Sequence, residues 1–391
     1  MTDKPQFVGK KVRLGDIVKI EKASMPSGNN VWVLNLDAVE KGTGKVIVKN
    51  RMKADSAGTS TVAFTADAVL YSKLRPNLNK VVVADEPGLA TSEMLPLIVN
   101  PEVLDRRYFA YLLRSNSFVN LAVSSTAGSK MPRMNKKTLL NAVFPIPSLE
   151  LQHQRIDLLS SIEKARTKAE LLIQQLDTLV KSRFIEMFGD LKQGYSCSSC
   201  RLGSISRIGS SRRVFRNELL SEGIPFYRGT EIAALSMGSE TSPSLFISKE
   251  RYDELVAITG KTEVGDLLLP SICPDGQIWR VDTGKPFYFK DGRVLWIHPN
   301  REIVDSIFLR HALSILFQMS FSDIASGTTF AEMKIFLLKE LEVPLPDITV
   351  QKKFAAFVAQ VDKSRFGGML HLLNSLSGIM HASFFSVADT D

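Results

Sequence analysis

Apolar residues recur at a helical spacing near the middle of the chain. The steps between them alternate between four and three residues, which is the heptad pattern of a helix that packs along another helix. Charged and amide side chains fill most of the positions between them. The pattern predicts one long helix over residues 149–188 that ends at Gly189. The apolar stripe consists of Leu158, Ile162, Ala165, Ala169, Leu172, Leu176 and Leu179.

A second stripe near the end of the chain repeats this spacing and predicts a matching helix near residues 347–386. Gly367 and Gly368 lie in its middle, and two interior glycines cost about 2 kcal/mol relative to alanine, so we expect a kink or break there. Because two equivalent apolar stripes can cover each other, the pattern predicts an antiparallel pair of helices. The stripe consists of Met369, Leu372, Leu376 and Ile379.

The chain also repeats itself on a larger scale. Residues 144–152 and 343–351 share two prolines and a glutamine at an offset of 199. Further pairs at this offset are 67–70 with 266–269 and 128–134 with 327–333, whereas 13–17 matches 201–205 at an offset of 188. The second copy therefore carries a net insertion of 11 residues (199 − 188). A repeat of this size predicts two homologous globular domains, each long enough to bury its own core.

The globular parts are predicted to mix short strands with helices. No regular alternation of strand and helix indicates a doubly wound sheet, so the expected fold class is mixed α/β (α+β), with two homologous domains joined by two long antiparallel helices. The expected strands are 31–36, 45–48, 81–83 and 287–289, and the expected helices are 104–113 and 304–313. The expected domains are 1–146 and 191–345, with spacer helices at 147–190 and 346–391.

Composition narrows the class of protein. With 44% hydrophobic and 23% charged residues, the chain resembles a folded protein rather than a disordered one. No apolar run is long enough to cross a bilayer and the first residues lack a signal-peptide core, so we expect a cytoplasmic location without membrane contact. The formal net charge of +8 favours an acidic partner, and nucleic acid is the first candidate.

Signatures of catalysis and metal binding are missing from the sequence. Cys197 and Cys200 form a Cys-x-x-Cys pair without two further zinc ligands, so a linker with two thiols is the favoured interpretation over a redox pair. Residues 41–45 lack phosphate-loop spacing and predict a hairpin turn. The five histidines show no metal-ligand spacing. We therefore expect neither a cofactor nor a metal in this chain.

One acidic cluster imitates a nuclease motif. Asp323, Glu332 and Lys334 have suitable chemistry, but the counterpart of Glu332 in the first copy is Arg133 and no acid replaces it. A catalytic motif is not expected in only one of two equivalent places, so the sequence favours a protein that is not an enzyme.

Basic and amide side chains gather instead at loop-like places in both halves. Such side chains reach phosphates as charges, or base edges through hydrogen bonds. For each residue, an ordinary solvated surface position is the alternative. In the first half the candidates are Arg51, Lys53, Lys73, Arg75, Asn77, Asn79, Lys80, Lys130 and Arg133. In the second half they are Arg212, Arg213, Arg228, Lys261, Gln277, Thr328 and Thr329, with Arg216 nearby.

Together these features resemble the DNA-specificity subunit of a type I restriction-modification system. The likeness lies in two variable domains, each followed by a Pro-x-Pro phrase and a glutamine-containing helix, and in residues 71–80, 128–133 and 265–269. The resemblance implies a non-catalytic reader in which each domain recognises one half of a bipartite, asymmetric site in double-stranded DNA. It also implies two methyltransferase subunits that carry S-adenosylmethionine, and restriction or translocase subunits that use ATP and Mg.

In this interpretation the helices serve as a spacer and as a dock for the methyltransferase subunits. About 35 helical residues span roughly 50 Å, so the half-site centres are expected on the order of one DNA turn apart. The alternatives are a DNA-recognition subunit of another phage-defence or modification system and a non-specific scaffold. The helix residues expected to pair or to bind partners are Leu158, Ile162, Leu172, Leu176, Leu179, Leu372, Leu376 and Ile379.

Overall fold

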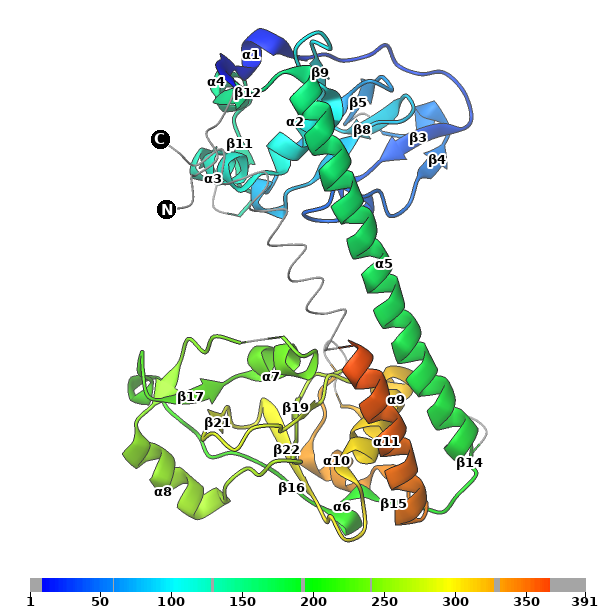
Figure 1. The fold of residues 1–391 in the computed structure, drawn as a ribbon, viewed down its shortest axis with the longest axis vertical. Coiled ribbons are helices and arrows are strands. Elements are labelled where there is room, and N and C mark those ends of the chain that lie inside the picture. Colours follow the sequence, from blue (N-terminus) through cyan, green and yellow to red (C-terminus); the bar gives the residue numbers. More distant parts are fainter. Residues whose placement is uncertain are drawn as a thin grey trace. The chain divides into compact units, whose positions relative to one another are not determined.

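The chain folds into two compact units that divide between Lys168 and Ala169. The computed structural model describes residues 9–58, 60–127, 130–190, 194–239, 241–326 and 331–365. Both units combine helices with short strands (Figure 1). The predicted mixed α/β fold class is confirmed.

Unit 1 is built on two four-stranded sheets. The antiparallel sheet β2-β9-β6-β7 consists of Val18–Ile20, Met94–Val99, Val69–Ser72 and Val81–Val83. The sheet β4-β3-β8-β5 consists of Asn50–Met52, Val31–Leu34, Gly88–Thr91 and Thr61–Phe64, and β3 runs parallel to β8. Two further pairs are β1 (Lys10–Arg13) with β12 (Val143–Ile146) and β10 (Thr126–Ala127) with β11 (Arg133–Met134).

Helices close the core of unit 1. Phe109 on α2 and Phe118 on α3 are fully buried, and both belong to the apolar cluster that includes Leu97 of the antiparallel sheet. The α2 helix begins where the Asp105 carboxylate accepts hydrogen bonds from the backbone N–H groups of Arg107 and Tyr108, which is a standard N-cap. The helices are α1 (Leu14–Ile17), α2 (Arg106–Arg114), α3 (Asn116–Ser124) and α4 (Lys136–Asn141), with short 3₁₀ turns at Leu36–Ala38, Ala54–Ser56 and Pro76–Leu78.

Unit 2 repeats this scaffold. Its antiparallel sheet β16-β22-β19-β20 consists of Ser206–Ser210, Val294–Pro299, Leu267–Pro270 and Trp279–Arg280. A second sheet, β18-β17-β21, consists of Phe246–Ile247, Ile224–Tyr227 and Tyr288–Phe289, with β17 parallel to β21. The pair β15 (Ser199–Arg201) and β23 (Glu342–Pro344) matches β1 and β12, and β13 (Gly189–Asp190) pairs with β14 (Gly194–Tyr195).

The two units differ in the segments that connect their shared strands. Unit 1 places β4 and β5 between β3 and β6, whereas unit 2 places α7 and α8 between β17 and β19. The repeat seen in the sequence is therefore a repeated scaffold with different inserts. The helices of unit 2 are α6 (Leu202–Ile205), α7 (Gly229–Ser236), α8 (Lys249–Thr259), α9 (Ser306–Ile324), α10 (Ile335–Glu340) and α11 (Ile348–Ser364), with a 3₁₀ turn at Arg216–Glu218.

The repeated glutamine has the same structural task in both units. In unit 1, the buried Gln152 side chain accepts a hydrogen bond from the Asp105 N–H at 2.8 Å and donates to the Val103 and Pro147 carbonyls. In unit 2, the buried Gln351 accepts from the Asp305 N–H at 2.9 Å. It donates to the Ile303 and Pro346 carbonyls. Each glutamine thus ties the start of a long helix to the N-cap of a core helix.

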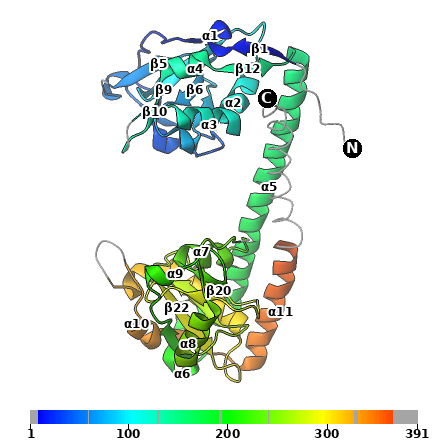
Figure 2. The same cartoon turned by 90° about the vertical axis from the view of Figure 1, so that its left-hand side faces the viewer.

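The first long helix, α5, spans Leu149–Phe188 as predicted. Its last turns belong to unit 2 and pack against α11, where Phe184 and Phe188 contact Phe354 with ring centroids 5.5 and 5.6 Å apart. Arg365, just after α11, forms an ion pair with Asp177 at 2.9 Å. Phe354, in the first half of α11, contacts the end of α5, whereas Arg365, after α11, contacts the earlier residue Asp177. The two helices are therefore antiparallel here (Figure 2).

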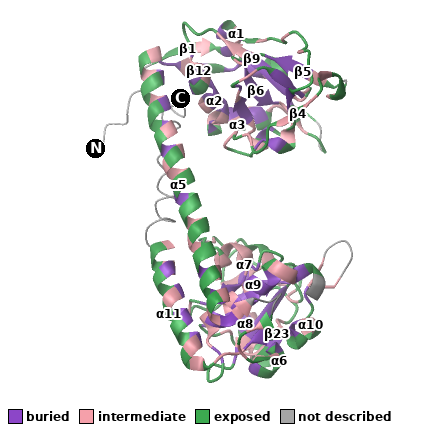
Figure 3. Ribbon diagram, turned by 90° about the vertical axis from the view of Figure 1, so that its right-hand side faces the viewer, coloured by how far each residue is buried: buried purple, intermediate pink, exposed green. Residues whose placement is uncertain are grey.

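Only part of the predicted apolar stripe of α5 is buried (Figure 3). Ile162 is buried and Leu176 packs against the core of unit 2. Leu158, Leu172 and Leu179 are 48%, 38% and 48% exposed. Ala169 of the stripe is also buried, and the other buried residues of α5 include Ile156, Leu159, Val180 and Phe184. The expected stripe residues Met369, Leu372, Leu376 and Ile379, and the Gly367–Gly368 pair, lie outside the described residues.

One predicted strand is wrong. Residues 45–48 form no strand, and only Val46 makes an isolated bridge, to Val39. Ile47 and Val48 are 61% and 53% exposed, so their β-branched side chains have no sheet to pack on. The adjoining turn is confirmed, because Gly42 and Gly44 both adopt positive φ angles, of 80° and 72°.

Candidate nucleic-acid interface

Two segments that are far apart in the sequence meet at one end of the antiparallel sheet of unit 1. The Arg75 N–H donates to the Pro132 carbonyl at 2.8 Å, and the Met134 N–H donates to the Lys73 carbonyl at 2.9 Å. Leu74 and Arg133 form an isolated bridge. These bonds bring together five of the predicted residues, which we call the unit 1 basic loops: Lys73, Arg75, Asn77, Lys130 and Arg133.

Arg75 occupies an unusual backbone conformation in these loops. Its φ and ψ of 49° and 64° lie in the left-handed region, which L-residues other than glycine seldom adopt and which is often found at functional sites. The side chains of Arg75, Asn77 and Lys130 are exposed and have no hydrogen bond or ion pair within the described parts of the chain. These three side chains are positioned to meet an external acceptor.

The other two cations of the basic loops share an internal partner. The Glu93 carboxylate accepts hydrogen bonds from Arg133 at 3.0 to 3.1 Å and lies 3.8 Å from the Lys73 ammonium. The hydrogen bonds from Arg133, together with the nearby Lys73 charge, hold the pKa of Glu93 below its usual value despite partial burial. Arg133 and Lys73 therefore fix the loops and are partly neutralised.

Three other candidates in unit 1 are bound within the fold. The Asn79 amide donates to the Arg114 carbonyl at 2.9 Å, and the Lys80 ammonium donates to the Leu36 carbonyl at 2.6 Å. Arg51 forms an ion pair with Glu86 at 2.8 Å. Lys53 is exposed on the surface. Asn79 and Lys80 thus act mainly as structural residues of their loop.

Arg75→Ala is expected to weaken DNA binding more than Arg133→Ala does. Arg75 has no internal partner among the described residues, so its charge is available to a phosphate or a base; its loss is expected to cost about 1–3 kcal/mol of binding free energy. Fluorescence-anisotropy titration of both variants with DNA that carries the recognition site measures this difference. A larger loss for Arg133→Ala would contradict the assignment.

In unit 2 the positive charge lies on a different loop. The loop after β19 that corresponds to residues 73–77 contains Ile272, Pro274 and Asp275 and no cation. Exposed arginines instead follow β16, in the segment 211–216. The Ser211 hydroxyl donates to the Phe289 carbonyl at 2.5 Å, and the Arg212 N–H donates to the Tyr288 hydroxyl at 2.9 Å. We call Arg212, Arg213 and Arg216 the unit 2 arginine cluster.

Among the described residues, no hydrogen bond or ion pair joins the other predicted residues of unit 2 to this cluster. Arg228 forms an ion pair with Glu231 at 2.5 Å at the start of α7. Partial burial alone would raise the pKa of Glu231, but hydrogen bonds from the Arg228 side chain and backbone outweigh it and hold that pKa at about 2. Lys261 is exposed and Gln277 is half-buried. Thr328 and Thr329 lie outside the described residues.

Glu332, part of the nuclease-like cluster, holds a loop in place. It accepts hydrogen bonds from Lys334 at 2.6 Å, Ser271 at 2.9 Å and Arg293 at 3.2 Å. The bonds from Lys334 and Ser271 lower the pKa of Glu332. The pair Arg293–Glu332 occupies the place of Glu93–Arg133 in unit 1 with the charges exchanged, which indicates a structural role. The Asp323 side chain lies outside the described residues, and those that are described contain no cluster of three or more metal-ligating side chains.

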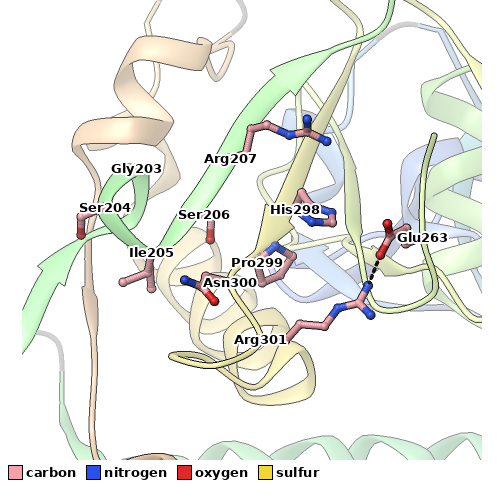
Figure 4. A pocket seen from close by; sticks show the side chains of 10 residues that line it. All are labelled: Gly203, Ser204, Ile205, Ser206, Arg207, Glu263, His298, Pro299, Asn300 and Arg301. Atoms are coloured by element: carbon pink, nitrogen blue, oxygen red, sulfur yellow. Dashed lines mark hydrogen bonds and ion pairs between the residues drawn. The ribbon is translucent and has the colours of Figure 1, made fainter. Parts of the chain in front are cut away.

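A recess of about 590 Å³ lies in unit 2 where β16 begins and β22 ends (Figure 4). Its charged groups are largely paired with one another. Arg301 donates to Glu263 at 3.1 Å, and the His298 ring Nδ1 lies 2.8 Å from the carboxylate of the buried Asp266. Arg207 lies over the Trp296 ring, 5.0 Å from its centroid. The pairing leaves the recess without a marked excess of positive charge, so we do not assign it to DNA.

Comparison with known proteins shows which proteins the chain resembles. Residues 9–176 match the family model of the type I restriction modification DNA specificity domain. The MjaVIII type I specificity subunit of Methanocaldococcus jannaschii is 22% identical over 388 residues, which cover 90% of this chain and 85% of that protein. Along most of its length the chain is similar to type I specificity subunits. The predicted resemblance is confirmed.

Two further relatives match parts of the chain. A putative type I specificity subunit of Haemophilus influenzae, S.HindORF215P, is 23% identical to this chain over 66% of the chain and 64% of its own length. The Escherichia coli EcoDI subunit is 27% identical over 36% of the chain and 31% of its own length. This chain therefore matches less than two thirds of these two relatives. The fold is shared with the S subunit of M. genitalium, at a TM-score of 0.56, 17% identity and coverage of 100% and 99%.

The structure adds residues that the sequence prediction left out of the candidate site. Phe215 lies between the arginines of the cluster, and Lys290 lies next to Phe289, to which Ser211 is bonded. The signal for Phe215 was present, since aromatic residues interleaved with arginines are typical of nucleic-acid surfaces. The signal for Lys290 was absent, because only the folded sheet brings residues 211 and 289 together. No helix in the described part of the chain is long and apolar enough to cross a membrane.

Proposed function

We propose that this specificity subunit is the non-catalytic DNA reader of a type I restriction-modification complex, with each unit recognising one half of a bipartite asymmetric site. One observation carries the proposal: the two units share a scaffold, but the cations that have no partner among the described residues lie on different loops. Unit 1 presents Arg75 and Lys130, and unit 2 presents the arginine cluster after β16. Equivalent scaffolds with different surfaces suit two different half-sites on one DNA.

The chemistry of these loops suits DNA. Arginine, lysine and asparagine side chains bind phosphates and read base edges in the major groove, where each base pair presents a distinct pattern of donors and acceptors. The bond to Pro132 fixes the backbone of Arg75, so the loop is ordered before binding. An ordered loop loses less conformational entropy on binding, which favours a specific complex over a diffuse one.

The helices are proposed to hold partner subunits. Leu158 in unit 1 and Leu172 and Leu179 in unit 2 expose apolar surface on α5, beside stripe residues that pack into the cores. Apolar residues at seven-residue spacing suit contact with a helical partner. We infer that two methyltransferase subunits dock on the helices and supply S-adenosylmethionine, and that restriction or translocase subunits supply the ATP- and Mg-dependent steps. The complex acts on double-stranded DNA in the cytoplasm.

The length of α5 is consistent with a spacer. Its 40 residues at 1.5 Å each give about 60 Å, which exceeds one turn of B-DNA at 34 to 36 Å. The proposed spacer therefore allows half-site centres on the order of one turn apart.

The proposed function is tested by deleting this chain from cells that also encode the methyltransferase beside it. We expect methylation at one split DNA motif to disappear, because the methyltransferase alone lacks the DNA-reading loops. Base-resolution sequencing of methylated positions in genomic DNA provides the readout, and re-expression of the chain is the control. Methylation that persists at the same motif after deletion would refute the proposal.

A further inference from the structure

Phe215 is an exposed aromatic residue within the unit 2 arginine cluster. Its side chain is 54% exposed, although a phenylalanine that served only the fold would be expected in the core. Single exposed apolar residues are common on protein surfaces, so exposure alone assigns no role. Two further features of the structure distinguish Phe215: the rigidity of its backbone and the charges on either side of it.

The backbone around Phe215 is fixed on both sides. The Phe215 N–H donates to the Glu218 carboxylate at 2.7 Å, and the Glu218 N–H donates back to the Phe215 carbonyl at 3.0 Å. Glu218 in turn forms an ion pair with Arg251 of α8 at 2.9 Å. On the other side, the Arg212 N–H is bonded to the Tyr288 hydroxyl. The backbone segment that carries Phe215 is therefore fixed by four named contacts.

Cations flank the ring. The Arg213 guanidinium lies 5.2 Å from the centroid of the Phe215 ring, within the range of a cation–π contact. Arg216 follows Phe215 directly and is exposed. Neither arginine side chain has a hydrogen bond or ion pair within the described ranges, so both charges remain available to phosphates. An apolar ring beside such charges matches the apolar faces of the bases and the charged backbone of DNA.

We propose that Phe215 is a specificity-determining residue of unit 2, whose ring makes an apolar contact with a base of the half-site while Arg213 and Arg216 bind the adjacent phosphates. The inference rests on the proposed function and extends it to one residue. A phenyl ring has no hydrogen-bonding group, so its base contacts are the 5-methyl group of thymine or the face of a base at a step that opens. Both contacts are apolar and involve no phosphate group.

Unit 1 has no aromatic residue at the position that corresponds to Phe215. At the offset of 188 that relates the strands β2 and β16, the position of Phe215 corresponds to Ser27 (215 − 188). The neighbouring residues 23–29 contain neither an aromatic residue nor a cation, and Met25 is 62% exposed there. The proposed contact therefore belongs to the half-site read by unit 2 alone.

The test uses the full-length chain assembled with its methyltransferase subunits and a duplex that contains the motif found by methylation sequencing. Phe215→Ala is expected to raise the Kd for this duplex roughly 10-fold, in line with the loss of one base–aromatic contact. The dependence of log K on log salt should keep its slope, since no phosphate contact is lost. Arg213→Ala should instead reduce that slope by about 0.9.

Two controls make the result specific to Phe215. Phe336→Ala removes a ring that is 65% exposed on α10 of the same unit, and it should leave the Kd unchanged. Replacing thymine by uracil in the unit 2 half-site removes the 5-methyl groups. Weaker binding of the wild type, together with a Phe215→Ala variant that no longer responds to uracil, identifies a methyl contact. An equal response of both proteins, with Phe215→Ala still about 10-fold weaker, identifies base stacking.

Failure of this inference is distinguishable from failure of the proposed function. If Phe215→Ala binds the motif as tightly as the wild type while Arg213→Ala binds more weakly, Phe215 makes no base contact and the DNA reader remains. If Phe215→Ala impairs assembly with the methyltransferase but leaves the Kd for DNA unchanged, the ring is a protein contact and the inference is overturned. If the wild type does not distinguish the motif from a scrambled duplex, the proposed function itself fails.

Discussion

Gln351→Leu is expected to lower the free energy of unfolding of unit 2 by about 3–5 kcal/mol. The side chain is fully buried, accepts from the Asp305 N–H and donates to the Ile303 and Pro346 carbonyls at 3.2 and 2.8 Å. Leucine has a similar size but leaves one donor and two acceptors without partners, and each buried polar group left unsatisfied costs about 1–3 kcal/mol. Urea unfolding followed by intrinsic fluorescence measures the change.

The equivalent glutamine of unit 1, Gln152, provides a matched test. Gln152→Leu should destabilise unit 1 to a similar extent, because its three hydrogen bonds have lengths of 2.8 Å and equivalent partners. Lys352→Leu, next to Gln351 but exposed, should change stability little and serves as the control. A loss of less than about 1 kcal/mol in both glutamine variants would show that water replaces the lost bonds.

Replacing all three arginines of the unit 2 cluster by alanine is expected to weaken DNA binding roughly 100- to 1,000-fold at moderate salt, at about 1 kcal/mol or more for each lost phosphate contact. Arg212, Arg213 and Arg216 are exposed and have no internal side-chain hydrogen bonds or ion pairs in the described parts of the chain. If each binds one phosphate, the slope of log K against log salt should fall by about 2.7. Anisotropy titrations at several salt concentrations give both quantities.

A charge-matched control separates the cluster from a general effect of net charge. Arg201, Arg183 and Arg301 are also exposed arginines, but they form ion pairs with Glu340, Glu186 and Glu263 at 2.8, 2.8 and 3.1 Å. Their triple replacement by alanine removes the same formal charge and should change affinity and salt slope much less. Equal losses in the two triple variants would mean that DNA responds to net charge and not to the arginine cluster.

The sequence predicted the larger features of the fold because those features repeat or follow a regular period. The bounds of α5, 149–188, follow from the position of Gly189 and from a heptad that continues over many turns. The glutamine of each Pro-x-Pro phrase was recognised as a repeated residue, and its buried hydrogen bonds explain the repeat. Residues 45–48 were misassigned because β-branched residues alone do not show whether a neighbouring strand is available.

The candidate site was harder to predict, since its properties depend on contacts between distant residues. Arg133 and Glu93 are 40 residues apart, and nothing local in the sequence shows that the two charges pair. Lys80 and Lys130 both lie in basic, loop-like segments, so the sequence does not distinguish them. In the structure Lys80 donates to the Leu36 carbonyl, whereas Lys130 is exposed. In contrast, the Arg228–Glu231 pair follows an i, i+3 spacing that the sequence alone could have indicated.

The most direct test of the central claim is to exchange residues 200–343 for those of another specificity subunit and to map methylated bases in cells that carry the methyltransferase. If each unit reads one half-site, the half of the motif read by unit 2 changes and the other half stays the same. A motif that stays unchanged, or that changes in both halves, would contradict the assignment of one half-site to each unit.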